Sequence, residues 1–168
     1  MKKDVFDEIL DQWSAERPEL ETTSLGVVIR VMGLYRSFLR DATRALEPLE
    51  LELWEYDVLS ALRRQGQPYA LSASRLARET DLSSGAMTNR IDRLEQRGFV
   101  KRVADLADRR GVNVSLTPEG TREIDKAIQR RLDSAAASLQ GLSEAEQNVL
   151  AGLLRTIVLS SRKDGSVA

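Results

Sequence analysis

The stretch SSGAMTNRIDRLEQRGFVKR, residues 83–102, decides the fold. Its apolar side chains recur on one face at the spacing of an α-helix: Met87, Ile91 and Leu94. Ser83 is a favoured N-cap residue, and Gly98 stands where helices commonly end in a left-handed residue. Ser72 offers a second N-cap upstream, so two short helices joined by a tight turn are predicted. The segment therefore predicts a helix-turn-helix.

The residues that follow predict a β-hairpin. Strands are expected at 99–103 and 112–116, because the second alternates apolar and polar side chains. Arg109 and Arg110 in the polar loop suit a narrow, electronegative minor groove, and Asp108 can orient one of them. A basic hairpin directly after a helix-turn-helix is a wing. Taken alone, the same hairpin would be an exposed turn with ordinary solvated charges.

Helices are expected on both sides of this segment, at residues 4–16, 24–46, 52–65, 118–139 and from Ser143 onward. Helix 24–46 carries apolar stripes on two opposite faces, so one of its packing partners is expected to be a second subunit. The predicted fold class is mainly α with a short β-hairpin wing. Its parts are an extra N-terminal helix (1–20), a winged helix-turn-helix DNA-binding domain (51–117) and a helical dimerisation region (21–50 and 118–168).

The composition excludes several kinds of chemistry. The 168 residues contain no Cys and no His, so a disulfide, a thiol nucleophile, a Cys/His zinc site and a Ser-His-Asp triad are impossible. We expect no metal, no cofactor and no enzymatic activity. The apolar runs are shorter than the roughly 18 residues that cross a bilayer, and the N-terminus lacks a signal peptide's apolar stretch. These features predict a cytoplasmic protein without a membrane partner.

The charge distribution is uneven although the net charge is −1. Residues 72–116 hold nine cationic and six anionic side chains, a net charge of +3, which leaves −4 for the rest. A cationic segment of this kind suits a nucleic-acid contact, although an ordinary solvated surface would have the same composition.

The polar face of the helix in 83–97 is the candidate DNA-reading surface. Small and polar residues there would let the helix enter a major groove closely: Gly85, Ala86, Asn89, Asp92, Arg93 and Gln96. Asn89 suits base edges, and Arg93 suits a phosphate. Ser83 and Ser84 stand at the helix N-terminus, which favours a phosphate.

These motifs resemble the signature of the MarR family of transcriptional regulators. The resemblance is carried by Leu76–Ala77, by residues 83–102 and by DRRGVNVSLTPEG at 108–120, and it covers about residues 53–121. It implies a homodimer that binds pseudo-palindromic double-stranded DNA and that a small ligand releases. It also implies DNA-contact roles for particular residues: Ser83, Ser84, Thr88 and Asn89 at the major groove, Arg110 in the minor groove and Asp108 supporting Arg110.

A narrower resemblance is to the urate-responsive (HucR and PecS type) branch of that family. It is carried by Gln12-Trp13, Arg17-Pro18-Glu19-Leu20, Trp54-Glu55-Tyr56-Asp57, Asn89-Arg90 and Lys101-Arg102. That branch binds its ligand through one Trp, one Asp and two Arg. The resemblance therefore implies a ligand site formed by Trp13, Asp57, Arg90 and Arg102.

Two of these positions are unusual on their own account. Asp57 falls on the apolar stripe of helix 52–65, where a carboxylate needs a partner. Arg90 lies about 60° from the inward face of its helix, so it is not aimed squarely at DNA. Three alternatives remain open: a structural Asp57–Arg90 ion pair, a plain core role for Trp13 and a phosphate contact for Arg102.

The predicted function is a transcriptional repressor, released from its operator by a small anionic ligand, urate or a related purine. In this hypothesis the ligand binds Arg90 and Arg102 with Trp13 nearby. Asp57 resists the added negative charge, and the recognition helix shifts because it carries Arg90. Two alternatives are a MarR-type regulator of phenolic or antibiotic-like ligands and a winged-helix module that binds protein instead of DNA.

Overall fold

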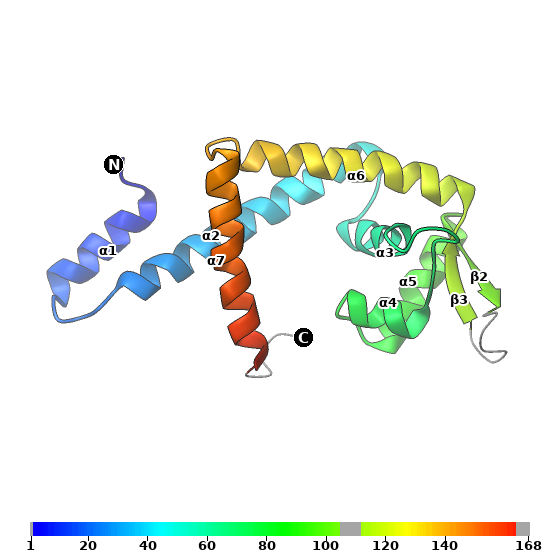
Figure 1. The fold of residues 1–168 in the computed structure, drawn as a ribbon, viewed down its shortest axis with the longest axis horizontal. Helices are drawn as coiled ribbons and strands as arrows, with labels where there is room; N and C mark the ends of the chain where they lie inside the picture. The colour runs from blue at the N-terminus through cyan, green and yellow to red at the C-terminus, as the bar shows by residue number, and fades with distance from the viewer. Residues whose placement is uncertain (1, 105–111, 164–168) are drawn as a thin grey trace. The chain divides into compact units, whose positions relative to one another are not determined.

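The computed structural model describes residues 2–104 and 112–163 (Figure 1). The chain divides into two compact units, residues up to 41 and residues from 42 onward. The N-terminal unit contains α1 (Val5–Glu16) and most of α2 (Thr23–Leu46). These bounds confirm the helices predicted at 4–16 and 24–46 to within about one residue.

Within the N-terminal unit, α1 packs closely against α2. A Cβ atom at Gly33 would lie 2.5 Å from Cζ of Phe6, so glycine is what lets the Phe6 ring approach the α2 backbone. Arg30 of α2 forms ion pairs with Asp4 (3.0 Å) and Asp7 (2.7 Å), the two carboxylates of the capping box that begins α1. The Phe6 ring and this ion-pair cluster thus both hold the N-terminal helix to α2.

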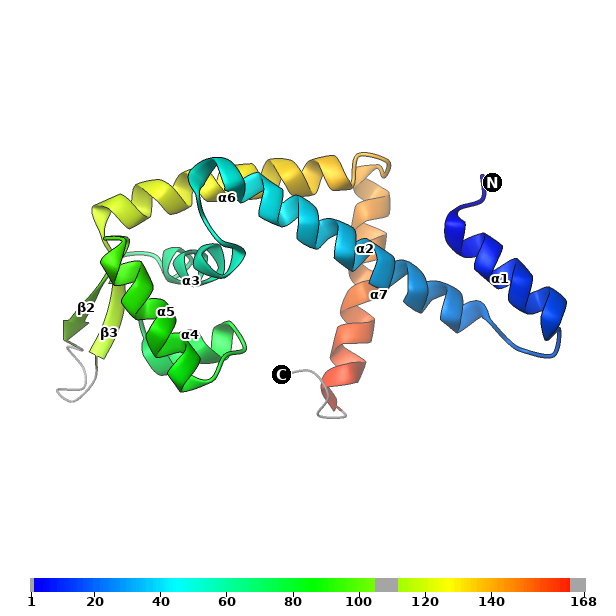
Figure 2. The same ribbon diagram turned by 180° about the vertical axis from the view of Figure 1, so that it is seen from behind.

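The C-terminal unit combines helices with a small sheet. Its elements are η1 (Glu47–Leu49), α3 (Leu53–Arg63), β1 (Ala70–Ser72), α4 (Ala73–Glu79), α5 (Ser84–Gln96), β2 (Val100–Ala104), β3 (Val112–Leu116), α6 (Pro118–Ser138) and α7 (Glu144–Lys163). The strands are antiparallel in the order β1-β3-β2, with Leu71 opposite Val114 and Val100 opposite Leu116. Figure 2 shows α3 between α6 on one side and α4 and α5 on the other. The predicted fold class, mainly α with a β-hairpin wing, is confirmed.

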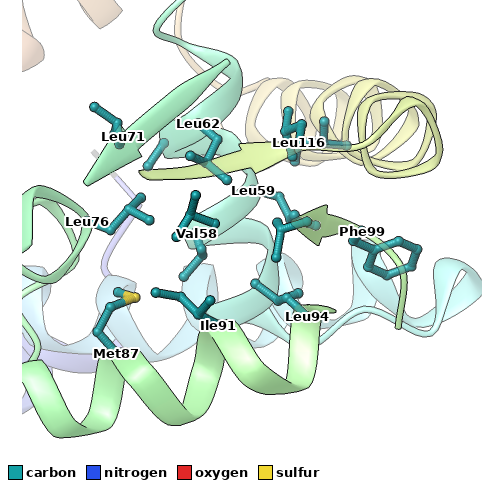
Figure 3. Close-up of a cluster of buried hydrophobic side chains, with 14 of the residues drawn as sticks. Val58, Leu59, Leu62, Leu71, Leu76, Met87, Ile91, Leu94, Phe99 and Leu116 are labelled. Atoms are coloured by element: carbon teal, nitrogen blue, oxygen red, sulfur yellow. The ribbon is translucent and has the colours of Figure 1, made fainter. Parts of the chain in front are cut away.

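The core of this unit lies where α3, α4, α5 and the sheet meet (Figure 3). Its labelled side chains are Val58, Leu59, Leu62, Leu71, Leu76, Met87, Ile91, Leu94, Phe99 and Leu116. The three apolar residues of α5 predicted to face inward are at most 2% exposed. Burying three such side chains contributes roughly 5–9 kcal/mol and fixes the rotation of α5 about its axis.

The predicted capping residues set the ends of α4 and α5. Ser72 accepts the backbone N–H of Arg75 (3.3 Å), and Ser83 accepts that of Ala86 (3.3 Å). Gly98 has a φ of +74°, the left-handed conformation expected where α5 ends. The helix-turn-helix predicted from these signals is confirmed.

The buried carboxylate of α3 is Glu55 and not Asp57, which corrects the prediction that Asp57 faces inward. Glu55 is 1% exposed, whereas Asp57 lies on the surface of the chain. The cause is that Glu55 has two partners: its Oε2 accepts the backbone N–H of Glu52 (2.9 Å) and pairs with Nη1 of Arg97 (2.5 Å). With those partners a carboxylate can be buried at this position.

Replacing Arg97 with methionine is expected to lower the free energy of unfolding by about 2–3 kcal/mol, because it leaves the Glu55 carboxylate buried without its cation. The control is Arg63→Met. Both arginine side chains are about one-third exposed, and both lie 4.7 Å from an aromatic ring. The partner of Arg63 is Asp125, whose side chain is 47% exposed, against 2% for Glu55. Arg63→Met should therefore lower the free energy of unfolding by less than about 1 kcal/mol.

Urea denaturation of the two variants and the parent at equal protein concentration measures the difference. Equal losses in the two variants would contradict a special role for the buried pair.

None of the helices in residues 2–104 and 112–163 has the length and apolarity that a membrane span needs. Acidic side chains in these same ranges form no cluster that could hold a metal ion.

Candidate DNA interface and ligand site

α5 presents to solvent the side chains that were predicted to contact DNA. Exposed on it, or at its N-cap, are Ser83, Ser84, Gly85, Thr88, Asn89 and Arg93. The opposite face is sealed in the core, so this polar face must point outward. A Cβ atom at Gly85 would meet nothing within 4 Å. The first turns of α5 can therefore approach another surface closely, as reading a major groove requires.

The hydrogen bonds of α5 leave some of its polar groups available. The hydroxyl of Thr88 donates to the carbonyl of Ser84 (3.0 Å), and the Ser83 hydroxyl caps the helix. The side-chain amide of Asn89 forms no hydrogen bond with any part of the chain that the structure describes. An exposed amide with both donor and acceptor free can pair with the edge of an adenine.

Two arginines of α5 lie against one tryptophan of α3. The guanidinium carbons of Arg90 and Arg93 are 5.1 Å and 4.7 Å from the centre of the Trp54 ring. This distance is that of a cation–π contact, which keeps the side chains near the ring without neutralising them. Arg93 is exposed and can still reach a phosphate, whereas Arg90 is partly buried.

The wing is described only at its base. β2 and β3 pair from Val100 opposite Leu116 to Ala104 opposite Val112, as the predicted hairpin requires. Arg109 and Arg110, predicted to enter the minor groove, and Asp108, predicted to orient one of them, lie outside the described residues. Their DNA contacts remain a prediction from the sequence.

Asp57 and Arg90 lie in one electrostatic neighbourhood but form no ion pair. Loss of water around the carboxylate raises the pKa of Asp57, and this outweighs the opposite effects of Arg131, Arg90 and Arg64. Within residues 2–104 and 112–163, no cation lies within ion-pair distance of Asp57. The structural Asp57–Arg90 ion pair considered as an alternative is therefore not formed.

The other two predicted ligand residues have surroundings of their own. Arg102 of β2 pairs with Asp92 (2.5 Å) and with Glu95, which hold it to the outer side of α5. Trp13 belongs to the N-terminal unit, where it is 43% exposed, so it is not plain core within that unit. Arg102 would have to leave its two carboxylates to bind a ligand anion.

Comparison with known proteins now identifies the family. The model of the MarR family matches residues 49–111. The HTH-type transcriptional regulator PecS of Dickeya dadantii (strain 3937) is 33% identical over 147 residues, which is 88% of this chain and 89% of that protein. The chain belongs to the MarR family. It is a DNA-binding transcriptional regulator, and the relatives that it matches are transcriptional regulators and not enzymes.

Two solved structures resemble this one along most of its length. A mutant of MarR from E. coli, complexed with operator DNA, has a TM-score of 0.68 at 25% identity and covers 92% of this chain and 99% of that chain. BpsR from Bordetella bronchiseptica, whose DNA binding is regulated by 6-hydroxynicotinic acid, has a TM-score of 0.68 at 26% identity. The matched region covers 84% of this chain and 97% of the BpsR chain. In this MarR-family chain α4 and α5 form the helix-turn-helix, and β2 and β3 begin the wing.

Sequence reasoning gave no site role to Trp54, Tyr56 or Arg131. Trp54 and Tyr56 precede Asp57 in α3, and the charge of Arg131 in α6 acts on both Tyr56 and Asp57. The spacing offered one signal for Arg131, since it lies four residues after Ala127 and seven after Ile124, both of which are fully buried. An arginine on the buried stripe of a helix is the same kind of anomaly that drew attention to Asp57.

Proposed function

We propose that this MarR-family regulator is a homodimeric repressor that a small anionic ligand, urate or a related purine, releases from its operator. The observation that carries the ligand part is Arg90. It lies on the recognition helix next to Asn89, it is partly buried over Trp54, and no ion pair within the described ranges neutralises it. An anion bound to Arg90 therefore acts directly on the helix that holds DNA.

Two exposed apolar faces support the homodimer. α7 exposes Val149, Leu153, Leu154, Ile157, Val158 and Leu159. In the N-terminal unit, α2 exposes Val27, Val28, Val31, Met32, Leu34, Tyr35, Phe38 and Leu39. Apolar faces of this extent on two long helices exceed what a monomer usually leaves in water, and a second copy of the chain would cover them. Such a dimer would place its two α5 helices in successive major grooves, about 10 bp apart.

The proposed release depends on a difference in affinity between two dimer states. A ligand can release the DNA only if it binds more tightly to the dimer arrangement that does not bind the operator. Urate at Arg90 brings negative charge beside the Asp57 carboxylate, and moving α5 relieves that repulsion. The movement changes the spacing of the two half-sites. Arg102 and Trp13 are proposed as further members of the site, on the resemblance to the urate-responsive branch.

A second ligand class has support from one comparison. BpsR is regulated by 6-hydroxynicotinic acid, an aromatic hydroxy acid, and it covers most of this chain. A phenolic acid such as salicylate is also a small planar anion that Arg90 and Trp54 could bind. Urate and salicylate are therefore compared in the same assay.

Asp57→Asn is expected to stabilise the folded chain at neutral pH. Because loss of water raises the pKa of Asp57 above its unfolded value of about 3.9, folding favours the protonated acid. The folded chain therefore bears the cost of the charged carboxylate at pH 7, and this cost disappears as the pH falls through the raised pKa. The variant should be more stable than the parent at pH 7, and the difference should shrink as the pH approaches about 4. Urea denaturation at several pH values tests this, and a difference that does not vary with pH would contradict it.

Isothermal titration calorimetry of urate into the free protein tests the proposed ligand. We expect saturable binding of one urate per chain, and weaker or no binding of salicylate. If the protein binds salicylate but not urate, the proposed ligand is a phenolic acid and not a purine. Absence of binding by both anions would overturn the proposed ligand control.

A further inference from the structure

Arg131 of α6 has a polar atom that the fold leaves without a partner. Its Nε is buried and donates no hydrogen bond to any residue within the described ranges. A buried N–H without an acceptor costs about 1–3 kcal/mol, and more when it belongs to a charged group. Buried donors of this kind are rare in native proteins, and each one calls for an explanation such as an acceptor supplied from outside the chain.

The surroundings of Arg131 are aromatic and carry an excess of positive charge. Its guanidinium carbon lies 5.7 Å from the centre of the Tyr56 ring. The nearby carboxylate is that of Asp57: partial loss of water raises the pKa of this group, and the charges of Arg131 and Arg90 oppose that rise. Arg64, the third cation there, is already paired with a glutamate of α4 at 3.4 Å. Two guanidinium groups thus share the neighbourhood of one carboxylate without pairing with it.

Each of the two unpaired arginines also lies by an aromatic ring of α3. Arg90 lies over Trp54 and Arg131 over Tyr56, and the two rings belong to the same helix as Asp57. An aromatic ring beside a guanidinium group suits a flat anion, because the ring contacts a face of the anion while the N–H groups bind its oxygen atoms.

We propose that Arg131 is a further ligand-binding residue, which donates its Nε–H and a terminal N–H to the acidic edge of a planar organic anion that Arg90 also binds. This inference rests on the proposed ligand control and adds a residue from α6 to it. Because Arg90 lies on α5, the ligand connects the recognition helix to the helix that follows the wing. A lysine at 131 would keep the charge but lose the Nε–H and the fork of two donors.

The test compares Arg131→Gln, Arg131→Lys and Arg130→Gln by calorimetric titration with urate, and with salicylate if that is the anion the parent protein binds. Arg130 is the matched control, since it is the neighbouring arginine and is exposed. We expect Arg131→Gln to weaken binding about 30-fold and Arg131→Lys about 10-fold, because hydrogen bonds to charged groups contribute about 1.5–3 kcal/mol. Arg130→Gln should bind within about twofold of the parent protein.

The outcomes separate this inference from the proposed function. If the parent binds urate or salicylate and both variants at 131 bind it as tightly, Arg131 is not a ligand residue, while the proposed function stands. If Arg131→Lys binds like the parent and Arg131→Gln does not, the role is general charge and the proposed hydrogen bonds are wrong. If the parent binds neither anion, the proposed function and this inference fail together. Circular dichroism of each variant shows whether it is folded.

Discussion

Arg90→Ala is expected to give a regulator that still binds its operator but that urate no longer releases. The side chain is partly buried and lies over Trp54, so its removal leaves the exposed DNA-reading face of α5 in place. It also removes the cation that we propose binds the ligand on the recognition helix. We expect urate affinity to fall at least about 30-fold, since a charge-assisted hydrogen bond contributes about 1.5–3 kcal/mol. Operator affinity should change by less than about threefold.

Arg93→Ala is the matched control for Arg90→Ala. It is the same residue type on the same helix, and it lies over the same ring at 4.7 Å. Because Arg93 is exposed on the outer face, its loss should weaken DNA binding and reduce the salt dependence by about one phosphate contact per half-site. Release by urate should remain. If Arg90→Ala still responds normally to urate, the assignment of the ligand site is wrong.

Gly120→Ala is expected to lower the free energy of unfolding by about 3 kcal/mol or more. A Cβ atom at this position would lie 1.9 Å from the backbone oxygen of Phe99, far inside contact distance. That oxygen also accepts the backbone N–H of Thr117 (3.0 Å), and the Thr117 hydroxyl donates to the carbonyl of Gly98 (2.6 Å). The start of α6 must therefore move away from the end of α5, and both hydrogen bonds must stretch.

The control for this substitution is Gly85→Ala, in the first turn of α5. A Cβ atom there meets nothing within 4 Å, and alanine is the better helix former by about 1 kcal/mol. Urea denaturation should therefore show a loss of stability for Gly120→Ala and a gain or no change for Gly85→Ala. Similar stability of the two variants would show that α6 is not tightly fixed against the loop before β2.

The helices could be predicted well because their signals are local. Ser72, Ser83 and Gly98 act through hydrogen bonds or dihedral angles within a few residues, and the structure confirms each of them. β1 was missed for the opposite reason. It has three residues, and pairing with β3, more than 40 residues later, is what makes it a strand. No periodicity can appear in so short a segment.

The electrostatics of the candidate site were harder to predict because they depend on distant partners. Helical spacing alone placed Asp57 inside, whereas the carboxylate that is buried is Glu55, two residues earlier, because Arg97 pairs with it. Arg131 joins the neighbourhood of Asp57 from α6, more than 70 residues away. The resemblance to the family supplied the proposed ligand residues, but the sequence did not show which carboxylate pairs with which arginine.

The most direct test is fluorescence anisotropy of labelled duplex DNA from the region upstream of the gene, at fixed salt, with the full chain and added urate or salicylate. We expect tight binding that weakens steeply with salt and that urate reverses at concentrations near its calorimetric Kd. Tight DNA binding that neither anion reverses would contradict ligand control through Arg90 and leave a MarR-family DNA-binding regulator without it.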